Sequence, residues 1–200
     1  MPSPESGHKI GAQEIKGLEK HYLLPRVSQE TADIVEGIID KGKLGQEFQH
    51  VFAEENEVLF EHMNFLLGKL AEIRKSAIPY DGSDPWLTGY HDGDPLFIAK
   101  DIYLLLEKQG AGGKKKGLLP KVTAETITDN SDGLKNNPDQ FDQEMDIAKQ
   151  DNPHFFEILY KMADRYEDKS NIGRINFEMG QLAYYILRTQ AQKEGLSQEL

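Results

Sequence analysis

Apolar residues recur every three or four positions through most of the chain, a spacing that predicts amphipathic helices. The longest such segment runs over residues 44–75. Its apolar stripe consists of Phe48, Phe52, Leu59, Leu66, Leu70 and Ile73. Two ionisable residues, Glu55 and His62, fall on the same stripe. Because burying an ionisable side chain without a partner is costly, we expect both to be paired, hydrogen-bonded or metal-bound.

Capping residues and helix breakers divide the rest of the chain. Ser28 is a typical N-cap for a helix that ends near Gly42, with Ile34 and Val35 facing inward. Asp-Pro and Asn-Pro pairs open three further helices, near residues 84, 94 and 152. Residues 139–150 and 171–194 complete the set, whereas 109–121 and 129–138 have loop composition and 123–128 fit a helical turn or a short strand. Strand-like alternation is almost absent, so the predicted fold class is all-α.

Composition limits the domain organisation and the location. Two hundred residues with 38% hydrophobic content can bury one core, and no repeated unit is evident. We therefore expect a flexible tail over residues 1–11 and one helical domain over 12–194. The chain begins without a signal-peptide pattern and has no apolar run long enough to span a bilayer, which predicts a cytoplasmic protein with no membrane contact.

Charge and cysteine content exclude several kinds of chemistry. The net charge of −11 argues against binding to duplex nucleic acid, whose phosphates are bound mainly by Lys and Arg. No cysteine is present, so disulfides, thiolate zinc sites and cysteine nucleophiles are excluded. Any metal ion would need His, Asp and Glu as ligands.

Three distant segments present such ligands in a helical context: Glu61-His62, His91-Asp92 and the stretch 162–165. A His in one helix, a His-Asp pair at the end of another and a later Asp form a pattern that resembles the HD-domain superfamily of metal-dependent phosphohydrolases. The resemblance covers residues 44–187 and implies an HD-like helical architecture. It also implies hydrolysis of a nucleotide or related phosphoester.

The same resemblance implies a role for each residue. The metal ligands would be His62, His91, Asp92 and Asp164. Two imidazoles and two carboxylates suit Mn²⁺, Co²⁺, Zn²⁺ or Fe²⁺, any of which lowers the pKa of a bound water. Lys100 or Arg165 would offset charge developing on the phosphoryl oxygens, and Asp94 would act as a base on the attacking water.

Each of these residues also has a structural explanation. His62 fits a core histidine bonded to a neighbour such as Glu55, while Asp92 and Asp94 fit turn or N-cap positions. Asp164 fits a solvated helix face. On this alternative the chain is a non-enzymatic acidic helical protein, a regulator, inhibitor or assembly subunit that binds a protein partner.

A third hypothesis is a di-metal carboxylate bundle. Glu47 and His50 form a Glu-x-x-His motif, with Asp151 and His154 as a degenerate second copy. Pro153 argues against it, because ligands in such bundles project from the middle of long helices and Pro153 places Asp151 before a helix begins.

Overall fold

The computed structural model describes residues 24–40, 46–76, 81–83, 94–111, 119–137, 139–166 and 171–196. Eight helices and no strand lie in these ranges, which confirms the all-α prediction. They are α2 (Gln29–Asp40), α3 (Gln46–Glu55), α4 (Glu57–Lys75), α6 (Phe97–Gly110), α7 (Ala124–Asn136), α8 (Asp139–Asp151), α9 (Pro153–Asp164) and α10 (Ile172–Leu196). No helix in this part of the chain could cross a membrane. The predicted tail and the short helix near residue 84 lie outside the described residues.

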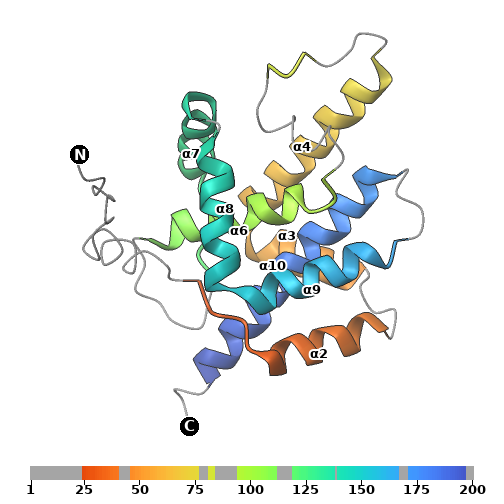
Figure 1. The fold of residues 1–200 in the computed structure, drawn as a ribbon, viewed down its shortest axis with the longest axis vertical. Helices are drawn as coiled ribbons and strands as arrows, with labels where there is room; N and C mark the ends of the chain where they lie inside the picture. Colours follow the sequence, from red (N-terminus) through yellow and green to blue (C-terminus); the bar gives the residue numbers. More distant parts are fainter. Residues whose placement is uncertain are drawn as a thin grey trace, which may run out of the picture.

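Helices α6 and α10 pack against each other at the centre of the molecule (Figure 1), and the other helices surround them. Helix α6 is strongly apolar, and its residues from Phe97 to Leu106 are buried except Lys100. Apolar residues that recur at helical spacing in these two helices and at the N-cap of α6 are buried: Leu96, Phe97, Ile102, Leu105, Leu106, Ile175, Met179, Leu182, Ala183 and Ile186.

The segment 44–75 is two helices rather than the predicted single one. Asn56 separates α3 from α4 and has φ −144° and ψ 61°, outside the helical region. Its buried side chain donates to the Pro120 carbonyl at 2.9 Å and accepts from the Val122 amide at 2.8 Å. These two bonds satisfy backbone groups of a distant loop, and they hold the chain at the point where the helix breaks.

Two other local predictions are corrected. Helix α7 continues to Asn136 through much of the region predicted as a loop, and it begins at Thr123, whose hydroxyl accepts from the Thr126 amide at 3.3 Å. In α2 the N-cap is as predicted, with Ser28 Oγ accepting from the Thr31 amide at 3.2 Å. Ile34, however, is 44% exposed, and Val35 alone of that pair faces the core.

The helices form two units with the same order and a shared sequence motif. The first unit comprises residues 24–28 followed by α2, α3, α4 and α6, and the second comprises residues 119–123 followed by α7, α8, α9 and α10. Each begins with a related segment, LPRVSQET at 24–31 and LPKVTAET at 119–126. Each also has a buried Asn, Asn56 or Asn152, directly before its third helix. The expectation that the chain has no repeated unit is therefore wrong.

Contacts between the two units are reciprocal. Asn152 of the second unit accepts from the Val27 amide at 2.8 Å and donates to the Pro25 carbonyl at 3.0 Å. Asn56 of the first unit makes the matching pair of bonds to the second unit, with Val122 and Pro120. When each partner gives the other the same contacts, the interface has two-fold character.

Two glutamines repeat this exchange. Gln190 in α10 accepts from the Ser28 amide at 3.1 Å and from the Thr31 hydroxyl at 2.6 Å. Gln109 in α6 accepts from the Thr123 amide at 3.1 Å and from the Thr126 hydroxyl. The repeated motif thus supplies the same cap residues to the central helix of the other unit in both cases.

The symmetry is not complete, because both α4 and α9 pack on α10. Gly180 in α10 explains the approach of α4: a Cβ built there would lie 2.8 Å from Ile98 Cγ2 and 3.0 Å from Met63 Sδ. Gly180 lies ten residues before Gln190, and the residue ten positions before Gln109 in α6 is Ala99. Only the second unit therefore offers its neighbours a central helix without a side chain at this point.

Gly180→Ala should consequently lower the free energy of unfolding by about 1–3 kcal/mol, although alanine favours the helix, because the core at this point has no room for a methyl group. Gly68→Ala is the matched control, since that position in α4 is exposed and has nothing within 4 Å of a built Cβ. We expect it to stabilise the protein slightly. Urea unfolding followed by circular dichroism measures both, and equal effects would contradict the close approach at Gly180.

Candidate functional site

The described site centres on a contact between His62 in α4 and Asp101 in α6. The distance from His62 Nε2 to Asp101 Oδ2 is 3.0 Å, and the side chains are 9% and 1% exposed. His62 therefore pairs with Asp101, whereas Glu55, the neighbour considered from the sequence, bonds to Arg188 and Tyr184. The prediction that His62 is satisfied by a partner is confirmed, with a different partner.

Burial dominates the electrostatics of Asp101. Desolvation raises the pKa of this carboxyl group above its ordinary value, while the hydrogen bond and charge of His62 and the charge of Lys108 lower it by less. The second oxygen, Oδ1, is buried and has no hydrogen-bond partner in the described part of the chain. A buried acceptor without a donor indicates a site that a water, a proton or a cation would stabilise.

The second unit shows what the fold requires at these positions. His62 lies six residues after Asn56, and Ile158 lies six residues after Asn152. Asp101 lies eight residues before Gln109, and Leu182 lies eight residues before Gln190. Ile158 and Leu182 are buried, at 1% and 0% exposure. The second unit thus places apolar side chains where the first unit places the His-Asp pair, so the fold itself does not demand a polar pair.

Asp94 and Lys100 lie together at the start of α6, close in sequence to Asp101. Asp94 Oδ1 accepts from the Leu96 amide at 2.8 Å, and its other oxygen pairs with the Lys100 ammonium. Asp94 is therefore part of the turn that opens α6, as the structural explanation predicted. Lys100 is largely buried and is the cation nearest along the chain to Asp101.

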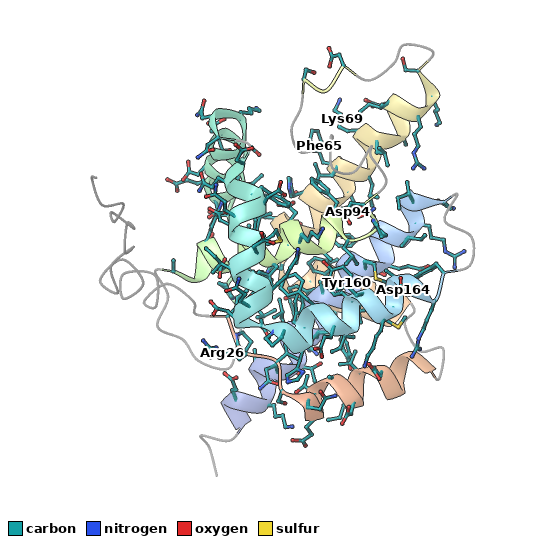
Figure 2. All side chains as sticks on the ribbon, in the orientation of Figure 1. Arg26, Phe65, Lys69, Asp94, Tyr160 and Asp164 are labelled. Atoms are coloured by element: carbon teal, nitrogen blue, oxygen red, sulfur yellow. The ribbon has the colours of Figure 1, made fainter. Side chains whose placement is uncertain are left out.

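The remaining predicted residues are not brought to this pair by the described structure. Asp164 and Arg165 are exposed at the C-terminal end of α9. Figure 2 labels Asp164 there, on a different element from Asp94, which precedes α6. His91 and Asp92 lie outside the described residues.

Metal-ligand geometry within the described ranges is limited to pairs. No group of three His, Asp or Glu side chains that could hold a metal ion occurs among these residues. Of the residues considered for a di-metal bundle, His50 contacts Glu54 at 3.3 Å and the partly exposed His154 contacts Glu157 at 3.3 Å, each within one helix. These contacts are typical of solvated ion pairs and provide no support for a bundle site.

Sequence reasoning missed Asp101, although a signal for it exists. It is the one acidic residue within the apolar run 95–106, and a charged residue at the centre of such a run has to be paired. Comparisons of the chain with protein-family models, curated proteins and solved structures found no match. The site is therefore argued from its own geometry.

Proposed function

We propose that the chain is a metal-dependent phosphohydrolase whose metal centre is built on His62 and Asp101. The observation that carries the proposal is the buried pair itself, an imidazole nitrogen and a carboxylate oxygen that come from two helices and lie 3.0 Å apart. A polar pair in a position that the second unit fills with Ile158 and Leu182 is a departure from the repeated pattern. Burying ions is rarely favourable for stability alone, so such a departure favours a functional role.

The spacing of the two donors fits metal ligation. Ligands about 2.1 Å from one ion and about 90–110° apart lie roughly 3.0–3.4 Å from each other. The observed separation is 3.0 Å. A nitrogen and an oxygen donor suit Mn²⁺, Co²⁺, Zn²⁺ or Fe²⁺, and the unpartnered Oδ1 of Asp101 leaves a second carboxylate oxygen for the site. His91 and Asp92 are the further ligands that the proposal requires from the sequence.

A bound divalent ion would supply a water of lowered pKa and offset charge on a phosphoryl group. The protein groups would act around it. Without an ion, the contact with Asp101 holds the His62 ring in place, and Lys100, held by Asp94, contributes a positive charge at the start of the same helix. A nucleotide or similar phosphoester is the proposed substrate.

The test is metal content measured by inductively coupled plasma mass spectrometry. The full chain is incubated with Mn²⁺, Co²⁺, Fe²⁺ and Zn²⁺ and then desalted. The wild-type protein should retain about one ion or more per chain. The double variant His62→Ile with Asp101→Leu, which copies the second unit, should retain none and should lose any phosphoesterase activity measured on a nucleotide panel.

His50→Ala provides the matched control, because this histidine is exposed and contacts only Glu54 in its own helix. It should leave metal content and activity unchanged. A wild-type protein that retains no metal, or a double variant that retains as much as wild type, would overturn the proposal.

A second candidate function, binding of a protein partner, is favoured by the outer face of α4. Phe65 is 58% exposed and Val58 is 36% exposed, seven positions apart on the same face. Figure 2 shows Phe65 next to Lys69, whose ammonium lies 5.8 Å from the ring centroid. If no metal is retained, Phe65→Ser becomes the first variant to compare with wild type in a pull-down.

A further inference from the structure

One contact between the two units includes an ion pair. Arg188 in α10, two residues before Gln190, donates from Nε to both carboxylate oxygens of Glu55 at 2.8 Å. Its Nη2 lies 2.8 Å from Glu55 Oε1. Glu55 is the last residue of α3 and directly precedes Asn56, and it also accepts from the Tyr184 hydroxyl at 3.2 Å. Opposite charges thus meet across this side of the interface.

The reciprocal contact has two acids at the same places. Glu107 in α6 stands two residues before Gln109, as Arg188 stands before Gln190. Asp151 directly precedes Asn152, as Glu55 precedes Asn56. Repeating the first contact would place a cation at position 107, but the chain has a carboxyl group there.

The surroundings of Glu107 are acidic and poor in hydrogen-bond partners. Burial, together with the charges of Glu144 and Asp151 in α8, raises its pKa from 4.5 to about 8. Lys108 on its own helix lowers the pKa by less, and its ammonium contacts Glu144 at 3.0 Å and Asn130 of α7. Helix α7 contributes an amide here rather than a charge. Glu107 Oε1 and Asn130 Nδ2 are buried, and neither has a hydrogen-bond partner among the described residues.

We propose that the chain is a fused dimer of two units, each with four helices in the described ranges, and that a proton on Glu107 stabilises the second inter-unit contact as Arg188 stabilises the first. With the proton in place, Glu107 is neutral beside Asp151 and Glu144. Without it, three carboxylates share a site that has one cation, and the packing of α6 on α7 and α8 weakens. The proton on Glu107 therefore makes the interface sensitive to pH on the α6 side.

The sign of the effect follows from proton binding. An unfolded chain releases the Glu107 proton near its ordinary pKa of 4.5, whereas the folded chain keeps it to about 8. Between these values the folded state binds more protons, so stability falls as pH rises. The contribution is present below about pH 4.5 and is lost once the pH has passed about 8.

Urea unfolding of the full chain in EDTA at pH 5 and pH 9 tests the proposal through three variants. Glu107→Gln keeps the shape of the protonated group, so it should match wild type at pH 5 and exceed it at pH 9. The ratio of folded to unfolded protein should fall from pH 5 to pH 9 in wild type. In this variant the fall should be smaller, by a factor of more than about ten. Glu107→Arg should fold and show the same reduced pH dependence, because an arginine at this position meets Asp151 as Arg188 meets Glu55.

Arg188→Glu creates the acidic arrangement on the other side and should add a second loss of stability as pH rises. Equal pH dependence of wild type and Glu107→Gln would overturn the role of the proton. A folded Arg188→Glu protein whose stability depends on pH as that of wild type does would overturn the equivalence of the two contacts. The equivalence would also be overturned if Glu107→Gln folds and Glu107→Arg does not. All three variants leave His62 and Asp101 intact, so the outcome is independent of the proposed metal centre.

Discussion

Replacement of His62 alone by Ala is expected to lower the free energy of unfolding by about 3–5 kcal/mol in metal-free buffer, because it leaves the Asp101 carboxyl group buried without its partner. Asp101 is 1% exposed, and its other oxygen has no hydrogen-bond partner among the described residues. Asp101→Ala should also be destabilising, since it removes a hydrogen-bond partner of the largely buried His62 ring.

The double replacement should behave differently. His62→Ile with Asp101→Leu reproduces the apolar residues that the second unit has in Ile158 and Leu182. Exchanging a buried ion pair for well-packed apolar groups is often neutral or stabilising by 1–4 kcal/mol, roughly, so this variant should be at least as stable as wild type.

A double-mutant cycle measured by urea unfolding in EDTA gives the coupling between the two positions. A double variant less stable than either single variant would show that the pair is needed for the fold. In that case the comparison with the second unit would no longer support a functional role. Running the cycle in EDTA separates the stability of the pair from any stabilisation by bound metal.

The second large effect is expected at Asn152, the residue that joins the start of α9 to the extended segment before α2. Its amide satisfies two backbone groups at once, the Val27 N–H and the Pro25 carbonyl. Asn152→Ala would leave both groups without partners at a buried position, and each unsatisfied group costs about 1–3 kcal/mol. We therefore expect a loss of roughly 2–5 kcal/mol in the free energy of unfolding.

Asn56→Ala should produce a loss of similar size, because Asn56 makes the reciprocal bonds to Val122 and Pro120. Asn171→Ala is the control: this exposed residue accepts from one helix amide, Arg174 N, at 3.2 Å, and its loss should cost about 1 kcal/mol. Thermal and urea unfolding monitored by circular dichroism measures all three. Strongly unequal losses at Asn56 and Asn152 would argue against equivalent roles in the two units.

Most helices could be predicted from local patterns, because capping and amphipathicity act over a few residues. Ser28 caps α2, Pro153 occupies the first turn of α9, and the apolar positions of α6 and α10 are buried. The break at Asn56 could not be predicted in the same way. Its cause is a pair of hydrogen bonds to a loop more than sixty positions away, and local spacing carries no information about such a partner.

The candidate site was predicted in part. His62 was selected because an ionisable residue on an apolar stripe needs a partner, and it has one. That the partner is Asp101 depends on how α4 and α6 cross, which periodicity does not determine. Asp94 and Lys100 also contact each other, and they do so through the local turn at the start of α6.

The sequence by itself determined that this protein is all-α, that most of its helices follow local capping and amphipathic patterns, and that His62 has to be satisfied. The related segments 24–31 and 119–126 were also present in it, but as short motifs of ordinary cap and turn residues they gained meaning only from their contacts. The tertiary structure decided that the two units exchange these contacts, that His62 faces Asp101, and that Glu107 faces other acids. These are pairings between residues distant in sequence, and they are set by the packing of whole helices rather than by the preference of any one segment.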